Sequence, residues 1–140
     1  MYLGLRLPLV RDSVAAGFPS PAEEFVDSRI DLNEYLVGNR MATFYVRTRG
    51  DSMVGAGILN GDLLIVDRSL EPRDGQVVVA RVDDGFTVKR WRRKGTRQFL
   101  VPENPDFAAM EMTGDRSFEI WGVVTYAIHS LSEAHGGRKG

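Results

Sequence analysis

From residue 43 onward, short stretches rich in apolar, β-branched and aromatic residues alternate with turns of glycine, aspartate and proline. Short strands with turn signals every 8 to 12 or so residues are typical of a mostly β fold. The Asp83-Asp84-Gly85 sequence between two such stretches is a strong hairpin signal. No stretch after residue 37 has the pattern of a long amphipathic helix. The segments expected to form strands are residues 43–48, 62–67, 76–82, 86–91, 99–102 and 118–128.

The first 36 residues are less regular. Two prolines and a glycine in residues 17–21 interrupt any regular element, and residues 22–36 mix helical with alternating spacing. Leucines followed by small residues in 1–17 faintly resemble a secretory signal, but charges and a proline interrupt the apolar run. We therefore expect an N-terminal arm at 1–26, a β domain at 27–131 and a disordered polar tail at 132–140.

Composition excludes several kinds of site. The chain has no cysteine and only two histidines, His129 and His135, so disulfides, thiolate nucleophiles, cysteine-based zinc sites and histidine-rich metal sites are ruled out. We expect neither a cofactor nor a metal. The 18 basic and 19 acidic residues leave a formal charge of −1, which argues against direct DNA binding through a general basic field.

Ser52 is the candidate nucleophile. It lies in Gly50-Asp51-Ser52-Met53, where an expected strand gives way to a glycine-rich loop. A tight turn of this kind exposes a hydroxyl and leaves backbone N–H groups free to stabilise an oxyanion. A serine also needs a base, which is either His129, in the last apolar stretch at 118–131, or Lys89. A lysine acts as a base only if burial keeps it neutral, and apolar neighbours in residues 86–91 favour that.

Two further features have structural explanations beside functional ones. Residues 89–97 hold six basic residues and a tryptophan, a pattern of nucleic-acid contact or of a solvated strand end and turn. Asp62 and Asp67 flank an apolar stretch, and their spacing of five puts them on opposite faces of a straight strand. Capping or turn roles are therefore expected for these two aspartates.

Three motifs together resemble the LexA/UmuD family of self-cleaving serine peptidases. They are Gly50-Asp51-Ser52-Met53, residues 60–67 and Gly85-Phe86-Thr87-Val88-Lys89. Segments 17–22 and 29–33 resemble the start of UmuD after its cleavage point, and Gly122-Val123-Val124 resembles the family's last strand. The resemblance covers roughly residues 14–131 and implies a peptidase fold like the LexA C-terminal domain, made of short, strongly bent strands.

The family pattern implies a Ser–Lys dyad of Ser52 and Lys89, 37 positions apart. It also implies an oxyanion site at the backbone N–H groups of Ser52 and Asp51. The scissile bond of the family precedes a glycine, which here is the bond between Ala16 and Gly17. UmuD usually has cysteine before this glycine, so the alanine is closer to LexA.

The resemblance also implies a biological setting. A RecA–single-stranded DNA filament would stimulate self-cleavage in the SOS response. The shortened homodimer would then join a UmuC-like catalytic subunit of a Y-family polymerase for translesion synthesis in the cytoplasm. Sixteen residues before Gly17 are too few for a helix-turn-helix domain, and no membrane anchor is expected, which argues against a repressor and a signal peptidase. The alternative is a non-enzymatic β binding module that uses residues 89–97.

Overall fold

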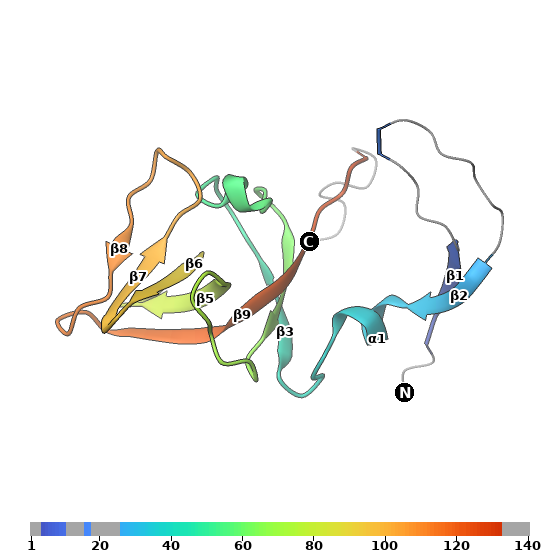
Figure 1. Cartoon of the computed structure of the whole chain (residues 1–140), viewed down its shortest axis with the longest axis horizontal. Coiled ribbons are helices and arrows are strands. Elements are labelled where there is room, and N and C mark those ends of the chain that lie inside the picture. The colour runs from blue at the N-terminus through green and yellow to red at the C-terminus, as the bar shows by residue number, and fades with distance from the viewer. Residues whose placement is uncertain (1–3, 11–15, 18–25, 133–140) are drawn as a thin grey trace. The chain divides into compact units, whose positions relative to one another are not determined.

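The computed structural model describes residues 4–10, 16–17 and 26–132 (Figure 1). Contacts divide the chain into two compact units, Met1–Gly38 and Asn39–Gly140. The expected boundaries of the arm and the β domain stay predictions. The expected tail lies outside the described residues except for Ser132. No helix of the described ranges is long and apolar enough to cross a membrane.

The first unit contains a two-stranded sheet and a short helix. Strand β1 (Arg6–Val10) pairs antiparallel with β2 (Val26–Asp31), and helix α1 (Leu32–Leu36) follows directly. Asp31 ends the strand and caps the helix, because its carboxylate accepts a hydrogen bond from the Asn33 N–H at 2.9 Å. Residues 26–36 therefore account for the mixed spacing seen in the sequence. The alternating residues form β2, and the helically spaced residues form α1.

The second unit is one antiparallel seven-stranded sheet with the order β3-β4-β9-β5-β6-β7-β8 (Figure 1). The mostly β fold is therefore confirmed, and all six expected strands are present. Strand β8 lacked a signal in the sequence because it spans two residues. The strands are β3 (Thr43–Arg47), β4 (Leu63–Asp67), β5 (Val77–Val82), β6 (Gly85–Lys94), β7 (Arg97–Val101), β8 (Met110–Glu111) and β9 (Phe118–Ile128).

The predicted hairpin joins β5 to β6. Val82 pairs with Gly85, so Asp83 and Asp84 form a two-residue turn, and Asp83 adopts a positive φ of 53°. Aspartate tolerates this left-handed conformation better than most residues do. The hairpin fixes the register of β6, in which Lys89 lies opposite Val78.

Strand β5 is buried on both faces and supplies both parts of the core. Val78 and Ala80 pack with Trp91 and Leu100, whereas Val79 packs on the other side. This alternation is the two-residue period of a strand that is covered on each face. The second cluster consists of Met53, Ile58, Leu64, Val66 and Val79. Because this cluster includes Met53, the core holds the residue that follows Ser52.

Candidate active site

Ser52 lies on the turn that follows β3. Gly50 has a φ of 90°, which the turn requires and which suits glycine, and its N–H donates to Asn60 Oδ1 at 2.8 Å. The buried Met53, only 3% exposed, anchors the turn on its other side. Val54–Ala56 then form a short 3-10 helix, η1. Ser52 is consequently held at the surface of the core between a fixed strand end and a fixed helical turn.

The turn before β4 brings the second motif to the same place. Gly61 donates its N–H to the Thr48 carbonyl at 2.9 Å, and Thr48 donates its N–H to the Asp62 carbonyl at 3.0 Å. Together with the bond from Gly50 to Asn60, these contacts join the motifs at 50–53 and 60–67. Two segments that are separate in the sequence therefore form one support for Ser52.

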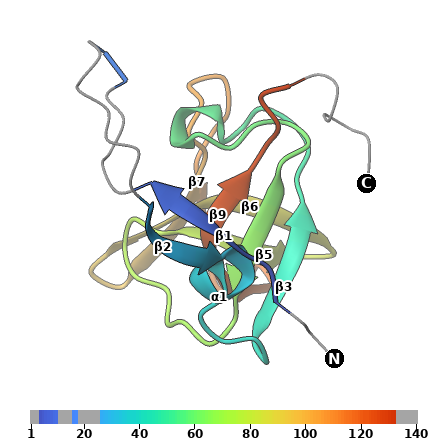
Figure 2. The same ribbon diagram turned by 90° about the vertical axis from the view of Figure 1, so that its right-hand side faces the viewer.

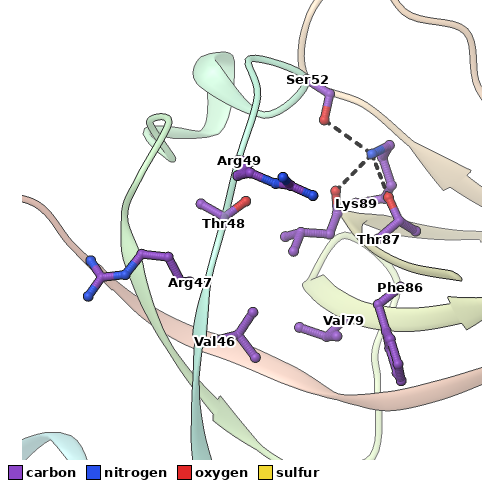
Figure 3. A pocket seen from close by; sticks show the side chains of 10 residues that line it. Val46, Arg47, Thr48, Arg49, Ser52, Val79, Phe86, Thr87 and Lys89 are labelled. Carbon is purple, nitrogen blue, oxygen red and sulfur yellow. Dashed lines mark hydrogen bonds between the residues drawn. The ribbon is translucent and has the colours of Figure 1, made fainter. Parts of the chain in front are cut away.

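Lys89 reaches Ser52 from β6. Its Nζ donates to Ser52 Oγ at 3.1 Å, to Thr87 Oγ1 at 2.7 Å and to the Val88 carbonyl at 3.1 Å (Figure 3). Thr87 and Lys89 lie two residues apart on one strand, so their side chains share a face, as the alternation of the strand predicts. The structure thus brings together the two residues that the sequence singled out as nucleophile and lysine base.

Burial lowers the pKa of Lys89 below its usual value of 10.5. The cause is desolvation, because an ammonium that loses part of its water is destabilised relative to the neutral amine. No carboxylate is hydrogen-bonded to Nζ in the described residues, so no ion pair there counters the desolvation. A larger fraction of Lys89 is therefore neutral near physiological pH than for an exposed lysine.

The dyad lines a pocket of about 260 Å³ between β3 and β6 (Figure 3). One end is polar, with Ser52 and Lys89, and Arg49 points toward them. The other end is apolar and is formed by valines together with Phe86, which is 59% exposed. The complete lining is Val46, Arg47, Thr48, Arg49, Ser52, Val79, Phe86, Thr87, Val88 and Lys89. An extended peptide can enter such an open pocket with its backbone beside the serine.

His129 does not belong to this site. Its Nδ1 lies 3.1 Å from Asp62 Oδ2, and it is not among the residues that line the pocket. Asp62 also accepts the Leu59 N–H at 2.8 Å, and Asp67 accepts the Ser69 N–H at 2.8 Å. The two buried aspartates therefore have the turn roles expected from the sequence. Because His129 contacts Asp62 and does not line the pocket, the geometry does not support His129 as the base.

Ala16 and Gly17, the expected cleavage site, are both exposed and belong to the first unit, whereas the dyad belongs to the second. The residues on either side of this pair lie outside the described ranges. The cleavage position therefore stays a prediction.

Three of the six basic residues in the run at 89–97 are paired with acids. Trp91 is only 4% exposed and packs in the core. Arg90 forms an ion pair with Glu103, Arg92 lies 3.8 Å from Asp74, and Arg97 lies 2.8 Å from Glu111. Each of these three arginines thus has its charge offset by a neighbour. This arrangement favours the structural explanation of the run over a nucleic-acid surface.

Sequence reasoning missed two contributors to the site. The alternation of a strand puts Thr87 on the face of Lys89, but it does not indicate that Thr87 is the nearest hydrogen-bond partner of Nζ. Glu103 contacts the serine turn through its backbone, because its N–H donates to the Ser52 carbonyl at 2.8 Å. A backbone contact depends little on side-chain identity, so the sequence carried no signal for it.

Within the described residues, no three acidic or histidine side chains are grouped to hold a metal.

Comparison with known proteins agrees with this geometry. The sequence model of the family described as Peptidase S24-like matches residues 8–125, which include Ser52, Lys89 and the pair Ala16 and Gly17. The chain belongs to the Peptidase S24-like family. The resemblance to LexA and UmuD is thereby confirmed at the level of the family.

Named relatives are similar over most of this chain. Protein ImpA of Escherichia coli is 42% identical over 128 residues, which cover 90% of this chain and 86% of ImpA. Protein MucA of Escherichia coli is 42% identical over 123 residues, or 87% of this chain and 84% of MucA. The LexA repressor of Azoarcus sp. (strain BH72) is 47% identical over 127 residues, or 90% of this chain and 62% of the repressor. Family and relatives together support an autoproteolytic serine peptidase of the LexA-like kind.

Proposed function

We propose that this chain is a self-cleaving serine peptidase that uses Ser52 as nucleophile and Lys89 as general base to cut its own bond between Ala16 and Gly17. The observation that carries the proposal is the 3.1 Å distance between Lys89 Nζ and Ser52 Oγ, combined with the lowered pKa of the lysine. A base within hydrogen-bond reach of a hydroxyl can take its proton as the hydroxyl attacks.

The hydrogen bonds of Lys89 suit this role. A neutral amine has two N–H groups and one lone pair. Thr87 Oγ1 and the Val88 carbonyl accept the two N–H groups, which leaves the lone pair directed at the Ser52 hydroxyl. The orientation of the amine is therefore set by groups of the same strand and needs no third residue with a charge.

The reaction begins when Lys89 takes the proton of the Ser52 hydroxyl as Oγ attacks the carbonyl carbon of Ala16. The backbone N–H of Ser52, with that of Asp51, stabilises the oxyanion; neither donates a hydrogen bond within the described residues. Protonated Lys89 gives its proton to the Gly17 nitrogen as the peptide bond breaks. Water then attacks the ester carbonyl of the acyl-enzyme as Lys89 takes a proton from it, and Ser52 Oγ regains a proton as the ester bond breaks. Residues 1–16 leave with a C-terminal carboxylate, and residues 17–140 are the other product.

We further propose a UmuD-like role for the product. In this role a RecA–single-stranded DNA filament stimulates cleavage, and the shortened homodimer joins a UmuC-like Y-family polymerase in translesion synthesis. The support for this role is the sequence resemblance in segments 17–22 and 29–33, together with similarity to ImpA and MucA over most of their length.

A direct test is to incubate the purified protein at alkaline pH and to weigh the products by mass spectrometry. We expect loss of residues 1–16 from the parent protein and no loss from Ser52→Ala or Lys89→Ala. Lys94→Ala is the matched control, because Lys94 is an exposed lysine on the same strand outside the pocket. Cleavage that persists in Ser52→Ala would overturn the dyad. Salt-dependent DNA binding without any self-cleavage would instead support the binding-module alternative.

A further inference from the structure

Glu103 joins the serine turn to the strand of the lysine base. Its backbone N–H donates to the Ser52 carbonyl at 2.8 Å, and its backbone carbonyl accepts the Gly55 N–H at 2.8 Å. The next residue adds a third bond, since Asn104 Nδ2 donates to the Asp51 carbonyl at 2.9 Å. Residues 103–104 thus hold the turn at three points around Ser52. Figure 2 shows η1 beside the loop that follows β7.

The side chain of Glu103 is held by Arg90, the residue that follows Lys89 on β6. Arg90 Nε donates to Glu103 Oε1, and one terminal guanidinium nitrogen of Arg90 donates to the Gly75 carbonyl at 2.6 Å. Both side chains of the ion pair are largely covered, at 22% and 32% exposed. A partly buried, charge-assisted hydrogen bond is stronger than a fully exposed ion pair.

We propose that the ion pair between Arg90 and Glu103 positions the Ser52 turn relative to Lys89, so that both are positioning residues for the Ser–Lys dyad. The pair connects one side of the dyad with the other: Arg90 is bonded covalently to Lys89, and Glu103 is hydrogen-bonded to the backbone of Ser52. Without the pair, residues 103–104 can still bond to the turn, but they are joined to β6 only through β7, whose Val101 pairs with Arg90. The bonds to the turn then open more often. The distance between Oγ and Nζ then depends on their own hydrogen bond, on core packing and on the pairing of β6 with β7.

Hydrogen exchange tests this connection independently of cleavage. The protein is studied in the Ser52→Ala background, which prevents self-cleavage, and exchange is followed for individual backbone amides. We expect Glu103→Gln and Arg90→Gln each to speed exchange of the Gly55 and Glu103 amides by about tenfold, since these amides open locally when the segment detaches. The amide of Val79 in the core serves as the internal reference and should not change. Unchanged exchange at Gly55 and Glu103 would overturn the proposal.

The kinetic test rests on the proposed function and separates positioning from simple electrostatics. We expect Glu103→Gln and Arg90→Gln both to lower the plateau rate of self-cleavage at high pH, by about tenfold, with little change in the midpoint of the pH profile. If the two residues acted only through charge, loss of the carboxylate would move the midpoint to lower pH and loss of the guanidinium would move it to higher pH. Opposite midpoint shifts with an unchanged plateau would therefore contradict positioning.

Arg92→Gln is the matched control. Arg92 lies in the same basic run and faces Asp74, but within the part of the chain described its side chain forms no hydrogen bond or ion pair with residues 50–55 or 103–104. We expect its plateau rate and its amide exchange to equal those of the parent. Absence of cleavage in the parent itself would contradict the proposed function, whereas normal plateau rates in both Gln variants of a cleaving parent would contradict only the positioning role.

Discussion

Thr87 Oγ1 lies closer to Lys89 Nζ than the Ser52 hydroxyl does, at 2.7 Å against 3.1 Å. The threonine therefore fixes where the amine sits, and the serine approaches an amine that is already held. In the proposed mechanism, the general base is therefore oriented by a neutral hydroxyl of its own strand.

The first prediction concerns this hydroxyl. Thr87→Val keeps the shape of the side chain but removes the acceptor of one N–H of Lys89, so the lone pair is no longer directed at Ser52. We expect self-cleavage to slow by about tenfold or more, since each 1.4 kcal/mol of lost orientation is a factor of ten in rate. Thr87→Ser keeps the acceptor and should retain most of the rate. Equal rates for the Val and Ser variants would show that the hydroxyl does not orient the base.

The second prediction concerns the pH dependence of cleavage. Only neutral Lys89 can accept the serine proton, so the rate should rise as pH increases through the pKa of Lys89 and then level off. Because burial lowers this pKa, the half-maximal rate should fall below pH 10.5, the usual value for lysine. Initial rates across a pH series, with fold monitored by circular dichroism, measure the midpoint. A rate that falls with rising pH while the protein stays folded would exclude lysine as the base.

The third prediction separates lysine from histidine. His129→Gln removes the imidazole but leaves Ser52 and Lys89 in place, so we expect the cleavage rate to stay within about twofold of the parent. The partner of His129, Asp62, is only 1% exposed. Loss of their hydrogen bond should lower the free energy of unfolding by about 1 kcal/mol, measured by urea denaturation. A large loss of cleavage without a loss of stability would restore His129 as a candidate base.

The fourth prediction concerns the close approach of the serine turn to Glu103. A Cβ added at Gly55 would lie 2.7 Å from the backbone carbonyl oxygen of Glu103, which cannot move without breaking its bond to the Gly55 N–H. We expect Gly55→Ala to destabilise the fold by about 1–3 kcal/mol and to slow cleavage. Gly114→Ala is the control, because a Cβ there meets nothing within 4 Å. Equal stability of the two variants would contradict the close contact.

The strands could be predicted because they depend on local features of the sequence, whereas the pairing of Ser52 with Lys89 was implied by the family resemblance. Strand β5 has the apolar run of a doubly buried strand, and the Asp-Asp-Gly turn sets the register that places Lys89 opposite Val78. The pairing of His129 with Asp62 and the bond of Glu103 to Ser52 join residues more than 50 positions apart. Such contacts follow from how the sheet bends and from backbone groups, which all residues share, so no side-chain pattern announces them.

The last prediction is a change of stability with pH that comes from Lys89 alone. Its pKa is lower in the folded protein than in the unfolded chain, so the unfolded chain binds more protons between the two values. Stability should therefore rise as pH increases from the folded pKa toward about 10.5, the unfolded value.

Lys89→Met removes this proton uptake. Measured in the Ser52→Ala background, the difference in melting temperature between the lysine and methionine variants should shift in favour of lysine with rising pH. Lys94→Met, at an exposed position of the same strand, should show no such trend. A constant difference across this range would show that the folded protein does not disfavour the charged form of Lys89.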